Sequence, residues 1–147
     1  MTRRLLVSLI APLALLGLIC PKAAAGAEAG GLFRRVSSAI ESADRAQLAD
    51  LFPADRKIAV SLHQIADLEG FAGAGPLAEA FHRYLSARTG IRFEREAGAR
   101  QDGPETMRVR GVLTSRDGAG KSQRIVLTFV FDGAGPGMKA VEVRETG

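Results

Sequence analysis

The chain has 147 residues, the length of one domain, and its 46% apolar and 24% charged residues are typical of a globular protein rather than a disordered one. Its formal net charge is +4, and it contains one cysteine and two histidines. A single cysteine excludes an internal disulfide bond and a metal site built from cysteines.

Residues 1–25 have the layout of a secretory signal peptide. Two arginines precede an apolar run from Leu5 to Cys20, and Ala23-Ala24-Ala25 supplies the small residues that signal peptidase requires. As a helix this run is about 24 Å long, shorter than the roughly 30 Å hydrocarbon core of a bilayer. We therefore expect cleavage after Ala25, with Ala27 as a competing cut site, and a periplasmic or secreted bacterial protein.

Two alternatives stay open for this leader. Retention as a membrane anchor is one, and lipid attachment at Cys20 is the other, although the lipoprotein pattern needs a small residue where Ile19 stands. No later stretch is long and apolar enough to span a membrane. We expect residues 26–31 to be a flexible N-terminus of the mature chain and residues 32–147 to form a single domain.

Removal of the leader makes the chain nearly neutral, because the leader holds three bases and no acid. Seventeen of the twenty bases then remain against sixteen acids. The arginines of the predicted strands alternate with glutamates, and one tyrosine and no tryptophan are available to stack on bases. These features exclude nucleic acid as the partner.

The first part of the domain has helical periodicity. Four apolar residues recur at spacings of three and four, namely Leu32, Phe33, Val36 and Ile40. They predict a helix through Ala43, followed by a second helical piece that Ser42 or Asp44 caps and that ends near Phe52, before Pro53.

A strand and a third helix follow. Residues 57–63 alternate between apolar and polar side chains, which predicts a strand, and the stretch from Gly70 to Gly75 reads as a linker. After Pro76, an apolar stripe predicts a helix that Gly90 ends; the stripe consists of Leu77, Phe81, Tyr84 and Leu85.

The rest of the chain has period two and predicts four strands in series. Their apolar rows are Ile91 and Phe93; Met107, Val109 and Leu113; Ile125, Leu127, Phe129 and Phe131; and Val141 and Val143. Turns rich in Asp and Gly join them into an antiparallel meander. We expect Gly111 to mark a bulge or sharp bend. The fold class is α+β, with N-terminal helices packed on a curved antiparallel sheet.

This order of elements, with the stretch Asp44-Arg45-Ala46-Gln47-Leu48-Ala49-Asp50-Leu51-Phe52 before the first strand, resembles the nuclear transport factor 2-like superfamily. That superfamily includes SnoaL-like and ketosteroid isomerase-like proteins, and the chain resembles in particular its small secreted members of undefined function. The resemblance covers Leu32 to Thr146. It implies a cystatin-like cone with a pocket between the sheet and the helices.

The resemblance also implies an occupant for the pocket and a second copy of the chain. We expect a small hydrophobic ligand in an apolar pocket lined by Phe81, Tyr84, Phe93, Met107 and Phe129. The other face of the sheet is partly apolar, which favours either an exposed face or a homodimer through it; its apolar and neutral residues are Val112, Val126, Thr128 and Val130.

Motifs for cofactors, metals and hydrolysis are missing or incomplete. Gly120-Lys121-Ser122 resembles the end of a P-loop, but Ser115 stands where glycine is needed and a strand follows. His63 and His82 have no zinc-binding spacing, and no G-x-S-x-G occurs. We therefore expect no cofactor and no metal.

Tyr84, His63 and Asp67 are the candidate catalytic residues. An isomerase of this fold needs a carboxylate base in an apolar pocket opposite hydrogen-bond donors, so these three side chains would have to converge. Our leading hypothesis is an exported protein that binds a ligand or partner without catalysis. The alternatives are an isomerase or hydrolase acting on a small hydrophobic substrate, and an assembly component of the cell envelope.

Overall fold

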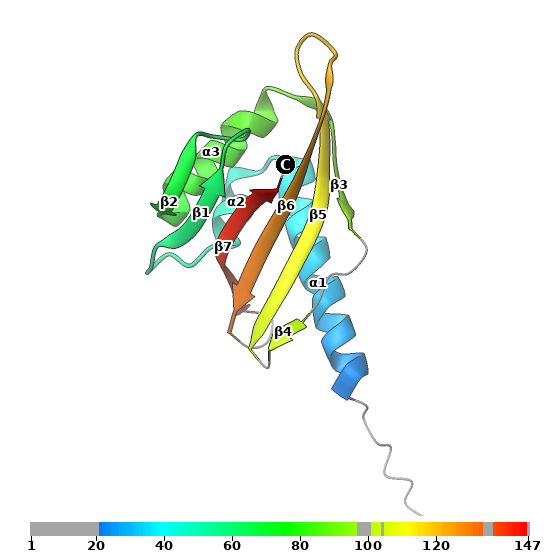
Figure 1. The fold of residues 1–147 in the computed structure, drawn as a ribbon, viewed down its shortest axis with the longest axis vertical. Coiled ribbons are helices and arrows are strands. Elements are labelled where there is room, and N and C mark those ends of the chain that lie inside the picture. The colour runs from blue at the N-terminus through cyan, green and yellow to red at the C-terminus, as the bar shows by residue number, and fades with distance from the viewer. Residues whose placement is uncertain (1–20, 97–100, 104, 134–136, 147) are drawn as a thin grey trace, which may run out of the picture.

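The computed structural model describes residues 21–96, 101–103, 105–133 and 137–146. Helices and strands follow one another in chain order (Figure 1): α1 Pro21–Ser42, α2 Arg45–Asp50, β1 Ile58–Leu62, β2 Leu68–Ala72, α3 Ala74–Ser86, β3 Thr89–Arg95, β4 Gln101–Gly103, β5 Thr106–Arg116, β6 Ser122–Asp132 and β7 Lys139–Thr146. The helices lie on one side of the sheet, which makes the chain an α+β fold with its helices against a curved sheet.

Helix α1 is longer than the periodicity predicts. It begins at Pro21 instead of Leu32 and is helical through residues 26–31, which we expected to be flexible. Alanine is the strongest helix former, and it occupies five of the seven positions from 23 to 29. Residues 1–20 of the predicted signal peptide, which comprises residues 1–25, lie outside the described residues. Asp44 is the N-cap of α2, where its carboxylate accepts a hydrogen bond from the amide of Gln47 at 3.0 Å.

The prediction of a linker from Gly70 to Gly75 is wrong. Residues 68–72 form strand β2, which pairs antiparallel with β1, and α3 begins at Ala74. Most of β2 is exposed, so it lacks the apolar alternation by which a strand is recognised. Gly70 has a φ of 101°, a backbone conformation that favours glycine within this edge strand.

The sheet has the strand order β2-β1-β7-β6-β5-β3, with the short β4 paired to β5. The last four long strands, β3, β5, β6 and β7, form the antiparallel meander that the sequence predicts. Strand β1 lies parallel to β7 and brings the β1–β2 hairpin to the other edge. This one parallel pair makes the sheet mixed rather than purely antiparallel.

Gly111 has a different role from the expected bulge. The pairing of β5 with β6 runs without interruption past it, and the register shifts lie elsewhere, between Thr89 and Arg92 on β3 and between Val130 and Phe131 on β6. The ring of Phe93 lies directly over Gly111, and a Cβ at this position would come within 2.7 Å of the ring carbon Cε1. The glycine thus makes room for an aromatic ring.

Five phenylalanine rings connect the helices to the sheet, and we call them the aromatic chain: Phe33, Phe93, Phe129, Phe81 and Phe52. Phe33 of α1 stacks on Phe93 of β3 with 5.5 Å between centroids, and Phe93 meets Phe129 of β6 edge-on at 6.3 Å. Phe81 of α3 follows at 6.2 Å, and Phe52 at 6.5 Å from Phe81. Such pairs stabilise beyond the burial of their area.

Helix α1 also satisfies the free edge of β3. The Glu41 carboxylate accepts a hydrogen bond from the amide of Phe93 at 3.0 Å, and the Ser37 hydroxyl donates to its carbonyl at 3.4 Å. Unpaired groups on an edge strand are otherwise free to pair with another chain. These two bonds fix the position of the Phe93 ring over Gly111.

Substitution of Gly111 by alanine tests this packing. The added methyl group collides with the buried Phe93 ring, so we expect Gly111→Ala to lower the free energy of unfolding by about 1–3 kcal/mol. Chemical denaturation of the variant measures it. Gly118→Ala is the matched control, because nothing lies within 4 Å of a Cβ there. Equal stabilities for the two variants would contradict the role assigned to Gly111.

Candidate functional site

The five residues expected to line an apolar pocket belong to the buried core. Their exposed fractions are 8% or less, and three of them, Phe81, Phe93 and Phe129, are members of the aromatic chain. Three hollows lie at the end of the β5–β6 hairpin and beside β2, and none of these five residues lines them. The interior of the cone is therefore occupied by aromatic side chains where we expected a ligand.

A polar cluster lies at one end of this core, around Tyr84 of α3. The Tyr84 hydroxyl donates to Oε1 of Gln123 on β6 at 2.9 Å, and Nε2 of Gln123 donates to Oε1 of Gln64 at 2.8 Å. The Arg88 guanidinium lies 4.1 Å from the centre of the Tyr84 ring. We call these residues, with Ser115 of β5, the Tyr84 cluster.

Two atoms of this cluster are buried without a hydrogen-bond partner among the described residues. They are Oγ of Ser115, a residue that is 3% exposed, and Nη1 of Arg88. A buried polar atom without a partner costs about 1–3 kcal/mol. The Ser115 hydroxyl is close enough to the Tyr84 hydroxyl to favour its ionised form, yet no hydrogen bond within ordinary distance and angle limits joins them.

Burial raises the pKa of the Tyr84 hydroxyl above its ordinary value. The nearby Ser115 hydroxyl and the Arg88 charge act in the opposite direction, and the Glu145 carboxylate adds to the increase. Tyr84 is therefore a neutral hydroxyl at physiological pH, able to donate and to accept a hydrogen bond.

Glu145 of β7 holds the turn that carries Gln64. Its two carboxylate oxygens accept hydrogen bonds from three successive backbone amides, those of His63 at 3.0 Å, Gln64 at 2.8 Å and Ile65 at 2.8 Å. Bonds to a charged acceptor are stronger than neutral ones. The β1–β2 hairpin is thereby fixed beside the Tyr84 cluster.

The three candidate catalytic residues occupy different surroundings. Tyr84 is buried in its cluster, whereas the His63 ring is exposed and lies 3.5 Å from the Glu69 carboxylate. Asp67 is an exposed residue between β1 and β2. Among the described residues, no hydrogen bond joins any two of these side chains. The other histidine, His82, bonds the carbonyl of Ala43 at 2.8 Å and so holds the turn after α1.

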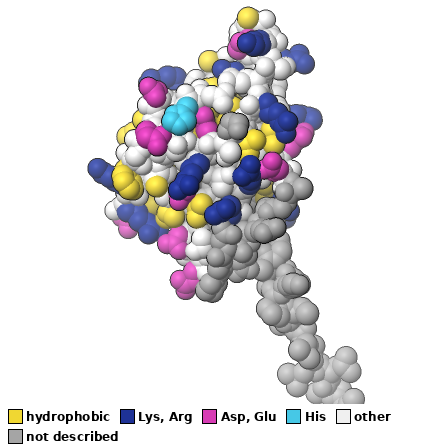
Figure 2. Space-filling view, viewed as in Figure 1, with side chains coloured by type: hydrophobic (Ala, Val, Ile, Leu, Met, Phe, Trp, Pro, Cys, Tyr) yellow, Lys and Arg dark blue, Asp and Glu magenta, His cyan; other side chains and the backbone are white. Residues whose placement is uncertain are grey.

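The outer face of the sheet, which points away from the helices, carries a half-exposed apolar patch. Val112, Val126, Thr128 and Val130 lie on it, as the sequence predicts, with charged side chains among them. Phe71 of β2 lies on the same face and is 73% exposed. It is in the same row across the sheet as Val130 of β6, because Val130 pairs with β7, β7 with β1, and β1 with Phe71. Figure 2 shows hydrophobic side chains interspersed with charged ones on this face.

Sequence reasoning missed Phe71, Arg88, Ser115 and Gln123. Ser115 carried a signal, because it ends the inward row of β5 with a hydroxyl. Within the part of the chain that the structure describes, no three His, Cys, Asp or Glu side chains are grouped to hold a metal ion. No described helix is both long and apolar enough to cross a bilayer.

Comparison with solved structures identifies the fold. No protein-family model matches the chain, and no curated protein matches it significantly in sequence. A designed NTF2 protein, Rd1NTF2_05 with several substitutions, superposes with a TM-score of 0.65 at 12% identity, covering 83% of this chain and 99% of its own.

Two natural proteins also have a similar fold at low sequence identity. Delta 5-3-ketosteroid isomerase from Mycobacterium sp. has a TM-score of 0.59 at 18% identity, covering 78% of this chain and 88% of its own. A hypothetical protein with a ketosteroid isomerase-like fold from Catenulispora acidiphila, in complex with trimethylamine, has a TM-score of 0.56 at 13% identity, covering 76% and 80%. The chain thus has the nuclear transport factor 2-like fold, as its sequence suggested.

Titration of Tyr84 tests the cluster, since it is the only tyrosine and the chain has no tryptophan. We expect tyrosinate absorbance to appear with a midpoint above that of the unfolded chain, which is about 10. Ser115→Ala raises the midpoint further, because Ser115 favours the ionised form, and Glu145→Gln lowers it. A midpoint equal to that of the chain in denaturant would contradict the burial of this hydroxyl.

Proposed function

We propose that the protein is an exported, non-catalytic binding protein that takes a small ligand with an apolar body at the Tyr84 end of its cone-shaped domain. The observation that carries the proposal is a pair of buried donors, Ser115 Oγ and Arg88 Nη1, which lie beside Tyr84 and have no hydrogen-bond partner among the described residues. Binding sites of this kind combine apolar walls with a few placed polar groups.

The chemistry of the cluster defines what the ligand must offer. Arg88 can only donate hydrogen bonds, and Ser115 and Tyr84 can donate and accept. A carbonyl or ether oxygen on an apolar body satisfies these donors, while the aromatic chain supplies the apolar wall beneath. The Catenulispora acidiphila protein of the same fold is in complex with a small molecule, trimethylamine, which supports a ligand-binding role for this chain as well.

Binding without catalysis is favoured by the separation of the candidate groups. An isomerase at this site needs His63 or Asp67 within hydrogen-bond reach of Tyr84 and its ligand. Both side chains are exposed, His63 within the turn that Glu145 holds and Asp67 after it.

Export is proposed from the leader at residues 1–25, and it places the protein in the periplasm or outside the cell. The mass of the exported chain decides between cleavage after Ala25 and cleavage after Ala27.

A homodimer through the outer face of the sheet completes the proposal. The half-exposed residues Val112, Val126, Thr128 and Val130, which we call the valine patch, lie on the same face as Phe71. The Phe71 side chain is 73% exposed, and covering it with a second copy removes its unfavourable contact with water. Two identical patches related by a twofold axis form a closed interface.

Binding of a neutral fluorescent ketone tests the ligand site. Prodan has a naphthalene body and a carbonyl acceptor, and we expect saturable binding with a blue shift of its emission. Arg88→Met removes a donor to the carbonyl and weakens binding about tenfold. Arg83→Met, at the exposed arginine just before it on α3, leaves binding unchanged. Loss of affinity in both variants, or no saturable binding to the native protein, would contradict the proposed site.

Sedimentation equilibrium tests the dimer. We expect the mature protein to sediment with twice the mass of one chain. We expect Val126→Glu to give a monomer, because a carboxylate within a buried apolar patch is costly. Ala46→Glu, on the exposed part of α2, adds the same charge and leaves the dimer intact. A native monomer at concentrations of about 100 μM would overturn this part of the proposal.

A further inference from the structure

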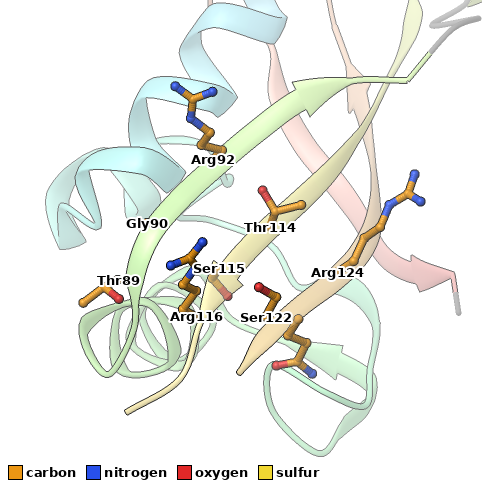
Figure 3. A pocket seen from close by; sticks show the side chains of 9 residues that line it. Thr89, Gly90, Arg92, Thr114, Ser115, Arg116, Ser122 and Arg124 are labelled. Atoms are coloured by element: carbon orange, nitrogen blue, oxygen red, sulfur yellow. The ribbon is translucent and has the colours of Figure 1, made fainter. Parts of the chain in front are cut away.

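A hollow on the outer face of the sheet lies at the end of the β5–β6 hairpin, next to the edge strand β3. Its volume is about 550 Å³. Three arginines and four hydroxyl-bearing residues line it, and Figure 3 shows them on three neighbouring strands: Thr89 and Arg92 of β3, Thr114, Ser115 and Arg116 of β5, and Ser122 and Arg124 of β6. Gly90 and Gln123 complete the lining. None of the described lining residues is Asp or Glu.

The strand register brings the three arginines together. Arg92 and Arg124 are both in register with Thr114, from opposite sides, so the three residues form a row across the sheet. Arg116 lies two residues further along β5 on the same face, opposite Ser122. Diagonal neighbours in a sheet are about 7–8 Å apart, within reach of one another for side chains as long as arginine.

This concentration of positive charge differs from the rest of the same face. Arg110 pairs with Glu96, and Arg144 pairs with Glu142. In the hollow, Arg92 has a distant partner in Glu94 at 3.8 Å, whereas Arg116 and Arg124 have no ion pair with a described acid. Like charges at neighbouring positions of a sheet destabilise it.

Asp117, which follows Arg116 in the sequence, is occupied by its own turn. The Asp117 carboxylate accepts hydrogen bonds from the backbone amides of Ala119 and Lys121, both at 2.9 Å. Lys121 is exposed beside this hairpin and adds another positive charge. The hairpin end therefore concentrates cations, and its one carboxylate is bonded to the backbone of its own turn.

We propose that this hollow is a binding site for the phosphate group of a ligand. It shares Ser115 and Gln123 with the Tyr84 cluster, but its three arginines lie outside that cluster, and the proposal does not rest on the function proposed for it. Guanidinium groups bind phosphate through paired, charge-assisted hydrogen bonds, and the hydroxyls of Thr114 and Ser122 supply further donors. A carboxylate carries one negative charge, whereas a phosphate monoester carries up to two and so balances the three guanidinium groups better. A phosphate monoester or a diphosphate has enough oxygens, and the volume exceeds that of one phosphate.

Calorimetric titration with sodium pyrophosphate tests the site on the mature protein. We expect saturable binding with a dissociation constant below about 1 mM. The double variant Arg116→Gln/Arg124→Gln weakens it by at least about tenfold, because it removes charge-assisted bonds. The control Arg34→Gln/Arg83→Gln removes the same charge from exposed positions on α1 and α3 and changes the affinity by no more than about twofold.

Vesicles separate the two sources of such a phosphate group. Co-sedimentation with phosphatidylcholine vesicles that contain phosphatidic acid, but not with pure phosphatidylcholine, assigns the site to a lipid headgroup when the Arg116→Gln/Arg124→Gln variant abolishes it. Binding of pyrophosphate alone assigns it to a free phosphorylated ligand. The proposal is overturned if neither probe binds, or if the control variant loses as much affinity as the double variant in the hollow.

Discussion

The contact of the Phe93 ring with Gly111 is the constraint on which the rest of the structure depends. It allows one ring to lie flat against the sheet while stacking on α1 and meeting Phe129 edge-on. Through Phe129 the aromatic chain continues to Phe81 of α3 and to Phe52, two residues after the end of α2. Because interiors are close-packed, a side chain on residue 111 would push apart every element that this chain connects. The backbone of Phe93 is held at the same time by Ser37 and Glu41 of α1.

Because side chains fill the interior, the groups that could bind a ligand or partner lie at the end of the core and on the outer face of the sheet. Tyr84 lies three residues after Phe81 on α3 but directs its hydroxyl to Gln123, so the apolar core ends in a polar cluster. The turn bound by Glu145 closes one side of that cluster. On the outer face, the valine patch and Phe71 occupy the middle strands and the β2 edge, whereas the three arginines occupy the hairpin end beside β3. The outer face of the sheet thus carries an apolar area and, at the hairpin end, a separate cationic area.

Local patterns were sufficient for much of this architecture, and their failures have physical causes. The period-two rows predicted the four strands of the meander, because one face of each is buried. Strand β2 was missed because its pairing depends on β1 and its own side chains are mostly exposed. The parallel pairing of β1 with β7 joins segments about eighty residues apart, as the register of Val60 with Val143 shows, and no local pattern contains it. Tyr84 was found from its helical stripe, but its partners lie on other elements, so only the fold could assemble them.

The packing of Phe93 is the point at which the account is tested most directly. A nuclear Overhauser spectrum of the mature, ligand-free protein reports which protons lie within about 5 Å of its ring, the scale of direct side-chain contact. The account predicts strong cross-peaks from the Phe93 ring to the α protons of Gly111 and to the rings of Phe33 and Phe129. A Phe93 ring without cross-peaks to Gly111, with signals typical of a solvated side chain, would contradict a filled interior. The centre of the cone would then have room for the ligand that the sequence predicted.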